Sequence, residues 1–166
     1  MVNVKKTVIL SLFLCIALVT HFIESQLPPI LPVPGIKMGL ANCITLIVYL
    51  IYGRKEAALV LFLRILIASL FFGSGMQFIY SLSGGILSFI VILLLYKFKD
   101  SIWVLSALSA VSHNLGQIIA AVFITKIKYL WWYLFPLTFF GILSGVFTGI
   151  IAGIIVKNKY IRKLFK

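Results

Sequence analysis

The chain consists of long apolar runs separated by short polar breaks, and this pattern restricts it to a helical bundle within a membrane. A helix needs about 20 apolar residues to cross the core of a bilayer. Six runs approach that length, at about 7–24, 39–53, 56–73, 76–97, 102–125 and 131–156. A mean hydropathy of +1.19, with only three acidic residues, excludes an ordinary soluble domain. We therefore predict an all-α integral membrane protein whose six transmembrane helices form one domain over residues 1–166.

Two segments could change the number of spans. The first run follows Lys5 and Lys6, as in a secretory signal, but no small-x-small cleavage site comes after it, so we expect a retained first span. The third and fourth runs are divided only by Gly73, Ser74 and Gly75. One helix over 56–97 is the competing interpretation, but it would be about 60 Å long, twice the bilayer thickness. We therefore expect a turn at the glycines.

The basic residues predict the orientation. With six spans and both termini in the cytoplasm, eleven basic residues are cytoplasmic: Lys5, Lys6, Arg54, Lys55, Lys97, Lys99, Lys157, Lys159, Arg162, Lys163 and Lys166. The outer segments then hold Lys37, Lys126 and Lys128. This bias follows the positive-inside rule and predicts a multi-pass protein of the cytoplasmic membrane. Because the basic residues cluster at the ends of apolar runs, the net charge of +12 does not indicate nucleic-acid binding.

The segment Glu24–Asn42 interrupts the apolar pattern near the start of the chain. Its prolines, Pro28, Pro29, Pro32 and Pro34, prevent helix formation because each lacks an N–H group. Gly35 and Gly39 then permit tight backbone turns. We interpret the segment as a lid or rim over a binding site between the helices.

Polar side chains within the spans share a similar depth. In the predicted topology the outer halves hold His21, Glu24, Asn42, Gln77, Ser81, His113, Asn114 and Gln117, with Arg64 slightly deeper and Lys37 in the loop above. Polar groups are costly in lipid, so we expect them to face one another around a ligand site. Gly84 and Gly85 would allow a backbone or ligand to approach closely. The alternative is that these groups only form hydrogen bonds between helices.

Arg64 lies in the middle of an apolar run and cannot belong to a loop. A charge at that depth costs several kcal/mol and normally faces the bundle interior or a wet cavity. One interpretation is a residue that binds an anion or gates the site. The other is a structural ion pair or a clamp on backbone carbonyls.

Small residues suggest two packing surfaces. Gly141, Gly145, Gly149 and Gly153 recur every four residues in the last span, a spacing that permits close helix packing. Ser11 and Cys15 form a weaker pair in the cytoplasmic half of the first span, where a partner could dock. We expect Cys15 and Cys43 to be ordinary packing residues rather than metal ligands or a disulfide.

No catalytic motif is recognisable in the sequence. It lacks the G-x-x-x-x-G-K-[ST] phosphate loop, the H-E-x-x-H zinc motif and a pair of Asp-rich segments for magnesium diphosphate. Serine, histidine and acidic residues are too few for a credible triad. We therefore expect neither an enzyme, nor a metal site, nor an intrinsic cofactor, and any ATP-driven step would need other subunits.

Four motifs together resemble the Gx transporter family, often labelled heptaprenyl diphosphate synthase component I. They are PGIKMGLAN at 34–42, LR at 63–64, YSLSGG at 80–85 and SHNLGQ at 112–117. This family is similar to the substrate-binding (S) components of energy-coupling factor transporters. The resemblance implies six helices, an outer ligand site under the first loop, a transmembrane coupling subunit and two partner ATPases.

The resemblance also implies site residues, all within or near these motifs. They are Lys37, Asn42, Arg64, Ser81, Gly84, Gly85, His113, Asn114 and Gln117, with Glu24 close to the first motif. Ser11 and Cys15 depart from the alanines with which S components commonly dock the coupling subunit. The synthase label fits poorly, because prenyl diphosphate synthesis needs acidic metal ligands that this sequence lacks.

The sequence is compatible with three functions. The first is a membrane subunit that binds and takes up a small vitamin-like or cofactor-like molecule, energised by partner ATPases. The second is a non-transport membrane subunit associated with isoprenoid or quinone synthesis. The third is a structural accessory protein of a membrane complex.

Overall fold

The structure is a computed structural model that describes residues 4–26, 41–72, 74–96 and 101–160. These residues form six α-helices and a short 3-10 helix, without a strand among them. The helices are α1 (Val4–Gln26), α2 (Asn42–Tyr52), α3 (Arg54–Phe72), α4 (Gly75–Leu94), α5 (Ile102–Thr125) and α6 (Leu134–Lys157), with η2 (Lys128–Tyr133) before α6. The predicted all-α bundle of six helices is therefore confirmed.

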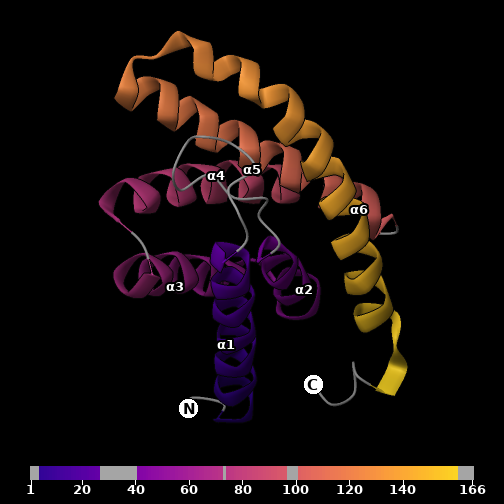
Figure 1. The fold of residues 1–166 in the computed structure, drawn as a ribbon. Coiled ribbons are helices and arrows are strands. Elements are labelled where there is room, and N and C mark those ends of the chain that lie inside the picture. The colour runs from indigo at the N-terminus through magenta and orange to yellow at the C-terminus, as the bar shows by residue number, and fades with distance from the viewer. Residues whose placement is uncertain (1–3, 27–40, 73, 97–100, 161–166) are drawn as a thin grey trace.

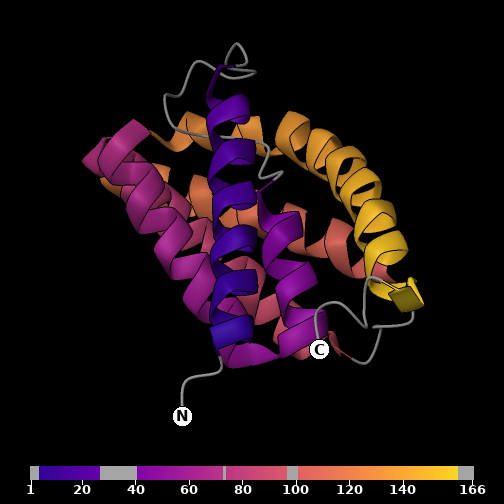
Figure 2. The same cartoon turned by 90° about the horizontal axis from the view of Figure 1, so that it is seen from below.

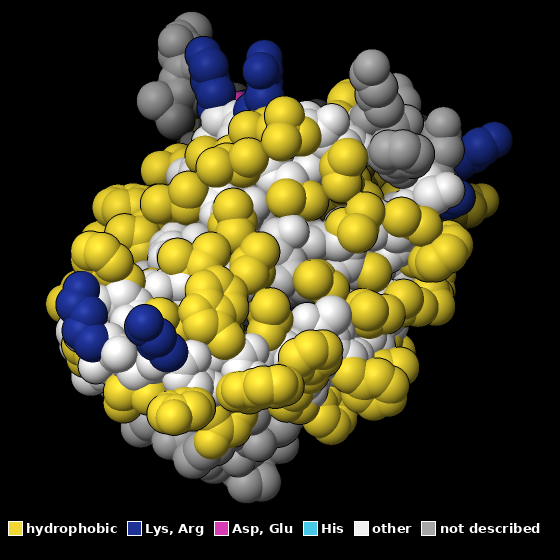
Figure 3. Space-filling view, turned by 90° about the horizontal axis from the view of Figure 1, so that it is seen from above, with side chains coloured by type: hydrophobic (Ala, Val, Ile, Leu, Met, Phe, Trp, Pro, Cys, Tyr) yellow, Lys and Arg dark blue, Asp and Glu magenta, His cyan; other side chains and the backbone are white. Residues whose placement is uncertain are grey.

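The helices differ in their ability to cross a bilayer alone. By length and composition, α1, α4, α5 and the unit Lys128–Lys157 qualify among the described residues. α2 has 11 residues and is only about 16 Å long, well short of a bilayer core. α3 has 19 residues but carries three charged residues at its start and Arg64 in its middle. The face of the bundle drawn in Figure 3 is mostly hydrophobic, with basic side chains near its edges, as expected for a surface in lipid.

Two breaks in the helices fall where the sequence predicts them. α2 and α3 are joined at Gly53, whose φ of 98° favours glycine, and the Gly53 N–H donates to the carbonyl of Tyr49. α3 and α4 are separate helices, so the alternative of one long helix over 56–97 is excluded. Ser74 caps α4 by accepting a hydrogen bond from the backbone N–H of Gln77 at 3.3 Å.

The helices pack as two groups of three (Figure 1). α5 lies between α4 and α6 and makes the most extensive contacts in the bundle with both. α1, α2 and α3 form the second group, which meets the first through α3–α4 and α2–α6 contacts. The start of α1 and the end of α6 lie at the same end of the bundle (Figure 2). At that end Lys6 forms an ion pair with Glu56, next to the Gly53 turn.

Glycines on α6 explain its tight contact with α5. A Cβ atom added to Gly145 would lie 2.6 Å from the Cα of Ala107, and one added to Gly149 would lie 2.5 Å from the Cα of Trp103. Gly141 is similarly close to the side-chain amide of Asn114. Gly153 departs from the predicted ridge, because a Cβ atom there would meet nothing within 4 Å. The ridge therefore packs within the chain over three of its four glycines.

Candidate functional site

Nine of the thirteen buried polar side chains among the described residues gather in the half of the bundle opposite the Gly53 turn. They come from five helices and are each at most 9% exposed: His21, Glu24, Asn42, Arg64, Gln77, Ser81, His113, Asn114 and Gln117. α1 and α5 end in this half, while α2 and α4 begin there. The antiparallel arrangement therefore brings together residues that are far apart in the sequence.

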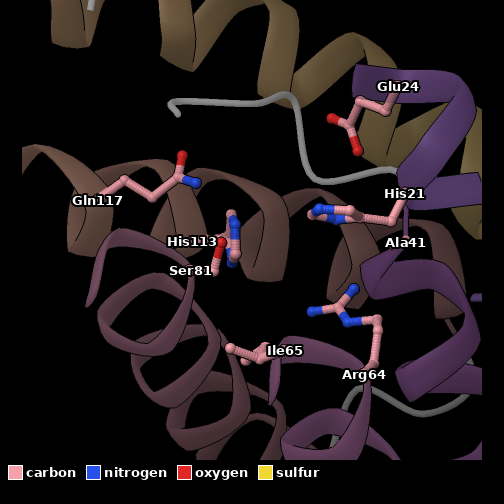
Figure 4. A pocket seen from close by; sticks show the side chains of 8 residues that line it. All are labelled: His21, Glu24, Ala41, Arg64, Ile65, Ser81, His113 and Gln117. Atoms are coloured by element: carbon pink, nitrogen blue, oxygen red, sulfur yellow. The ribbon is translucent and has the colours of Figure 1, made fainter. Parts of the chain in front are cut away.

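A small cavity lies at the centre of this cluster (Figure 4). Its lining residues are His21, Glu24, Ala41, Arg64, Ile65, Ser81, His113 and Gln117. In the figure the side chains from α1 and α3 point across the space toward those from α4 and α5. The volume is about 20 Å³, which accommodates about one water molecule. The polar residues converge on one cavity, and among the described residues their side chains fill most of the space between them.

Arg64 is the dominant charge of the site. It is 4% exposed, and its Nη2 donates a hydrogen bond to Oδ1 of Asn42 at 3.0 Å. Glu24 lies close enough to interact with it electrostatically. Its Nε has no hydrogen-bond partner among the described residues. A buried guanidinium is costly unless its donors are satisfied, so this free donor is an available contact for an acceptor.

Three further buried atoms around Arg64 also lack a partner within the described part of the chain: Asn42 Nδ2, His113 Nδ1 and Gln117 Oε1. Buried polar groups without hydrogen bonds are rare in proteins. The amide nitrogen of Asn42 is a donor, the amide oxygen of Gln117 is an acceptor, and His113 can serve as either. Of these residues, His113 and Gln117 line the cavity together with Arg64. Arg64 Nε and His113 could donate to a small anion, and Gln117 Oε1 could accept from an ordered water.

Gln77 and His21 join α1 to α4 at the side of the cavity. Gln77 Nε2 and His21 Nε2 lie 3.3 Å apart, within hydrogen-bond distance. Gln77 does not itself line the cavity, and neither does Asn42, which supports Arg64 through its hydrogen bond. Both residues therefore position the side chains that line the cavity.

The two glycines of the YSLSGG motif are packing positions in this structure. A Cβ atom on Gly84 would lie 2.7 Å from the carbonyl oxygen of His113, and one on Gly85 would lie 2.8 Å from Cδ1 of Ile65. Neither glycine lines the cavity. They instead allow α5 and α3 to approach α4 closely enough for their polar residues to meet.

Asn114 does not face the cavity. Its Nδ2 donates to the carbonyl of Leu137 on α6 at 2.7 Å. Neighbouring residues of a helix point in different directions, so His113 and Asn114 cannot share a face, whereas His113 and Gln117 can. Lys37 and most of the proline-rich segment lie outside the described residues.

Sequence reasoning missed three residues that line the cavity, His21, Ala41 and Ile65. It placed His21 at the correct depth but did not assign it to the site, although His21 and Glu24 have the three-residue spacing of a common helix face. Ile65 gave no signal, because an isoleucine in an apolar run is indistinguishable from its neighbours.

Ser11 and Cys15 are both exposed on α1, so a partner could reach them. No group of three or more His, Cys, Asp or Glu residues among those described could hold a metal ion. Ser81 contributes a hydroxyl group to the cavity lining.

Comparison with known proteins gives one match. The family model described as heptaprenyl diphosphate synthase component I matches residues 13–155, which include every residue of the cavity. No curated protein and no solved structure matches the chain.

Proposed function

The chain belongs to the heptaprenyl diphosphate synthase component I family, and we propose that it is a membrane-embedded binding subunit that holds a small anionic molecule at Arg64. The anion would accept a hydrogen bond from Arg64 Nε, while Asn42 holds the guanidinium in place by accepting from Arg64 Nη2. His113, Ser81 and Gln117 would fix its orientation from the opposite wall.

One observation carries this proposal: the Arg64 guanidinium is 4% exposed and has, within the described part of the chain, an Nε donor without a partner beside a cavity. A bundle that needed Arg64 only for stability would satisfy all of its donors, because leaving one unpaired costs free energy. Replacing a buried ion pair by apolar residues is often neutral or stabilising, so a polar cluster of this size is weak as a purely structural device.

Ligand entry would require the two groups of helices to separate, because 20 Å³ is too small for anything larger than water. α1 is the natural element to move. Of the four candidate spans, α1 has the smallest share of buried residues in its apolar stretch, 22%. It also contributes His21 and Glu24 to the cavity wall. A shift of α1 would open the cavity without disturbing the α4–α5–α6 packing.

In the uptake form of this proposal, the ligand is a vitamin-like or cofactor-like molecule captured from outside the cell. A coupling subunit docked near Ser11 and Cys15, together with two ATPases, would drive its release into the cytoplasm. The resemblance of the four sequence motifs to the Gx transporter family, which is itself similar to S components, supports this form.

The family description favours a second form, in which the chain is a non-catalytic membrane subunit of prenyl diphosphate synthesis. The acidic ligands for magnesium would then come from a partner component. The same cavity would hold the diphosphate group of a substrate or product.

Binding of inorganic diphosphate by the purified chain tests the proposal. We expect Arg64→Ala to weaken binding at least tenfold in calorimetry while the helical circular dichroism is unchanged. Arg54→Ala is the matched control, since Arg54 is an exposed arginine at the start of the same helix. Equal binding by both variants would refute the proposal.

Native mass spectrometry of the purified chain separates the two forms. A co-purifying vitamin or cofactor supports uptake, whereas a bound prenyl compound supports the synthase subunit.

A further inference from the structure

An apolar groove runs along the outside of the bundle between α3 and α4, and we call it the α3–α4 groove. Its lining residues are Ala58, Leu61, Phe62, Ile65, Leu82, Ile86, Phe89 and Ile90. Its volume is about 280 Å³, compared with 20 Å³ for the polar cavity. Every lining side chain is apolar, so the groove suits a hydrocarbon and not a polar ligand.

Ile65 lines both the α3–α4 groove and the polar cavity. It is 3% exposed, and in Figure 4 it lies at the edge of the cavity below Ser81 and His113. Gly85 on α4 leaves room for it, since a Cβ atom there would lie 2.8 Å from Ile65 Cδ1. The side chain that follows Arg64 in sequence therefore separates the charged site from the apolar groove.

A second groove, between α4 and α5, provides a comparison. It is also largely apolar and has a volume of about 430 Å³, with Ile79, Leu82, Ser83, Ile86, Leu87, Gly116 and Ile119 along its wall. None of these residues lines the polar cavity. The connection to Arg64 is therefore a property of the α3–α4 groove and not of every hollow on the lipid-facing surface.

We propose that the ligand is an anion that carries a single apolar chain, with its charged head at Arg64 and its chain passing Ile65 into the α3–α4 groove. This inference rests on the proposed function and holds for both of its forms, because such a molecule can be a cargo or a substrate. It adds the class of ligand and the side from which the ligand enters.

Physical chemistry favours this division of the ligand. The cavity has room for a small head group only once its walls move, and among the described residues Ala41 and Ile65 are the apolar residues that line it. The groove offers that surface at the level of the lipid, so the chain need never cross water. A change in the side-chain rotamer of Ile65 is a small motion that would join the two spaces. A ligand that enters sideways from the bilayer would also keep its chain in an apolar environment throughout.

The test compares farnesyl diphosphate with inorganic diphosphate, using the full chain in phosphatidylcholine nanodiscs and empty nanodiscs as the reference. We expect farnesyl diphosphate to bind at least tenfold more tightly. Ala58→Trp fills the exposed far end of the groove and should reduce that advantage to less than threefold. Ile119→Trp is the matched control in the α4–α5 groove and should leave the advantage intact.

A second variant keeps the test informative if Ala58→Trp fails to fold. Ile65→Ala removes the separating side chain and should increase the rate at which farnesyl diphosphate binds, with a smaller effect on inorganic diphosphate. If the two ligands bind equally and depend equally on Arg64, the apolar tail of the ligand has no binding site on the protein. This inference is then overturned while the proposed function stands. If neither ligand binds, both fail. If a co-purified phospholipid occupies the groove and farnesyl diphosphate cannot displace it, the groove is an ordinary lipid contact and the inference is also overturned.

Discussion

Arg64 and Asn42 illustrate how a single pair can hold a charge inside this bundle. The hydrogen bond of 3.0 Å between them joins α3 to α2, and both side chains are less than 10% exposed. Hydrogen bonds to charged groups contribute roughly 1.5–3 kcal/mol, about twice as much as neutral ones. Asn42 therefore matters to folding as well as to the geometry of the site.

We predict that Asn42→Ala destabilises the bundle by about 2 kcal/mol, because it leaves a buried donor of Arg64 unpaired. The free energy of unfolding can be measured by titrating dodecyl sulfate into mixed micelles. Thr45→Val is the control one turn further along α2. The Thr45 hydroxyl is buried without a partner among the described residues, so its removal should cost less than about 0.5 kcal/mol. A similar loss in both variants would contradict this account.

The residues of the site could be predicted from their type and depth, but their individual directions could not. Apolar runs fix which polar residues are buried, and steps of four residues place His113 with Gln117 on one face of α5. Which neighbour each face meets depends on helix rotation and crossing, and these are set by packing. For that reason Asn114 was grouped with His113 although it bonds to Leu137 of α6.

The contact between α5 and α6 governs the stability of the bundle at the level of its elements. It depends on backbone-to-backbone approach at glycines rather than on large side chains, as is common between helices in lipid. Because the close atoms at Gly145 and Gly149 belong to the backbone of α5, they cannot move aside as a side chain could.

We predict that Gly149→Ala destabilises the bundle by about 1–3 kcal/mol, the usual cost of overpacking. Gly153→Ala, one turn along the same ridge, should be neutral or stabilising, because a methyl group there meets nothing and alanine favours helix. The same titration in mixed micelles measures both. Equal destabilisation would mean that the effect comes from the glycine repeat itself and not from contact with Trp103.

The spacing of glycines predicted the ridge but not its limit. A repeat of four residues identifies one face of a helix, whereas the length of the contact depends on where the partner helix ends. α5 begins at Ile102, and the ridge already contacts its first turn through Gly149 and Trp103. Gly153 therefore lies beyond the reach of α5.

For the molecule as a whole, hydropathy was sufficient to predict six helices and their order. Hydropathy was less reliable about which helices cross the bilayer, since α2 is too short to cross it alone. The closed cavity could not have been predicted either, because hydropathy reports which residues are buried and not how fully they occupy the space between helices.

The orientation of the bundle yields a prediction at this scale. Lys128 and Lys159 lie on either side of α6, which has 24 residues and is about 36 Å long. An impermeant maleimide should label Lys128→Cys in intact cells but label Lys159→Cys only after permeabilisation. Both substituted lysines are exposed, so access to the cysteine should be governed by the membrane alone. Labelling of Lys159→Cys alone in intact cells would reverse the predicted topology.

The cavity lies where the two groups of three helices meet, with Arg64 on one side and His113 on the other. A molecule bound there would contact both groups of helices at once. By mass action it would favour the folded bundle over the unfolded chain. At a concentration one hundred times its dissociation constant, such a molecule adds about 2.7 kcal/mol to that preference. The physiological ligand would therefore raise the unfolding temperature of the bundle, and a melting experiment would detect it without an assay of chemistry or transport.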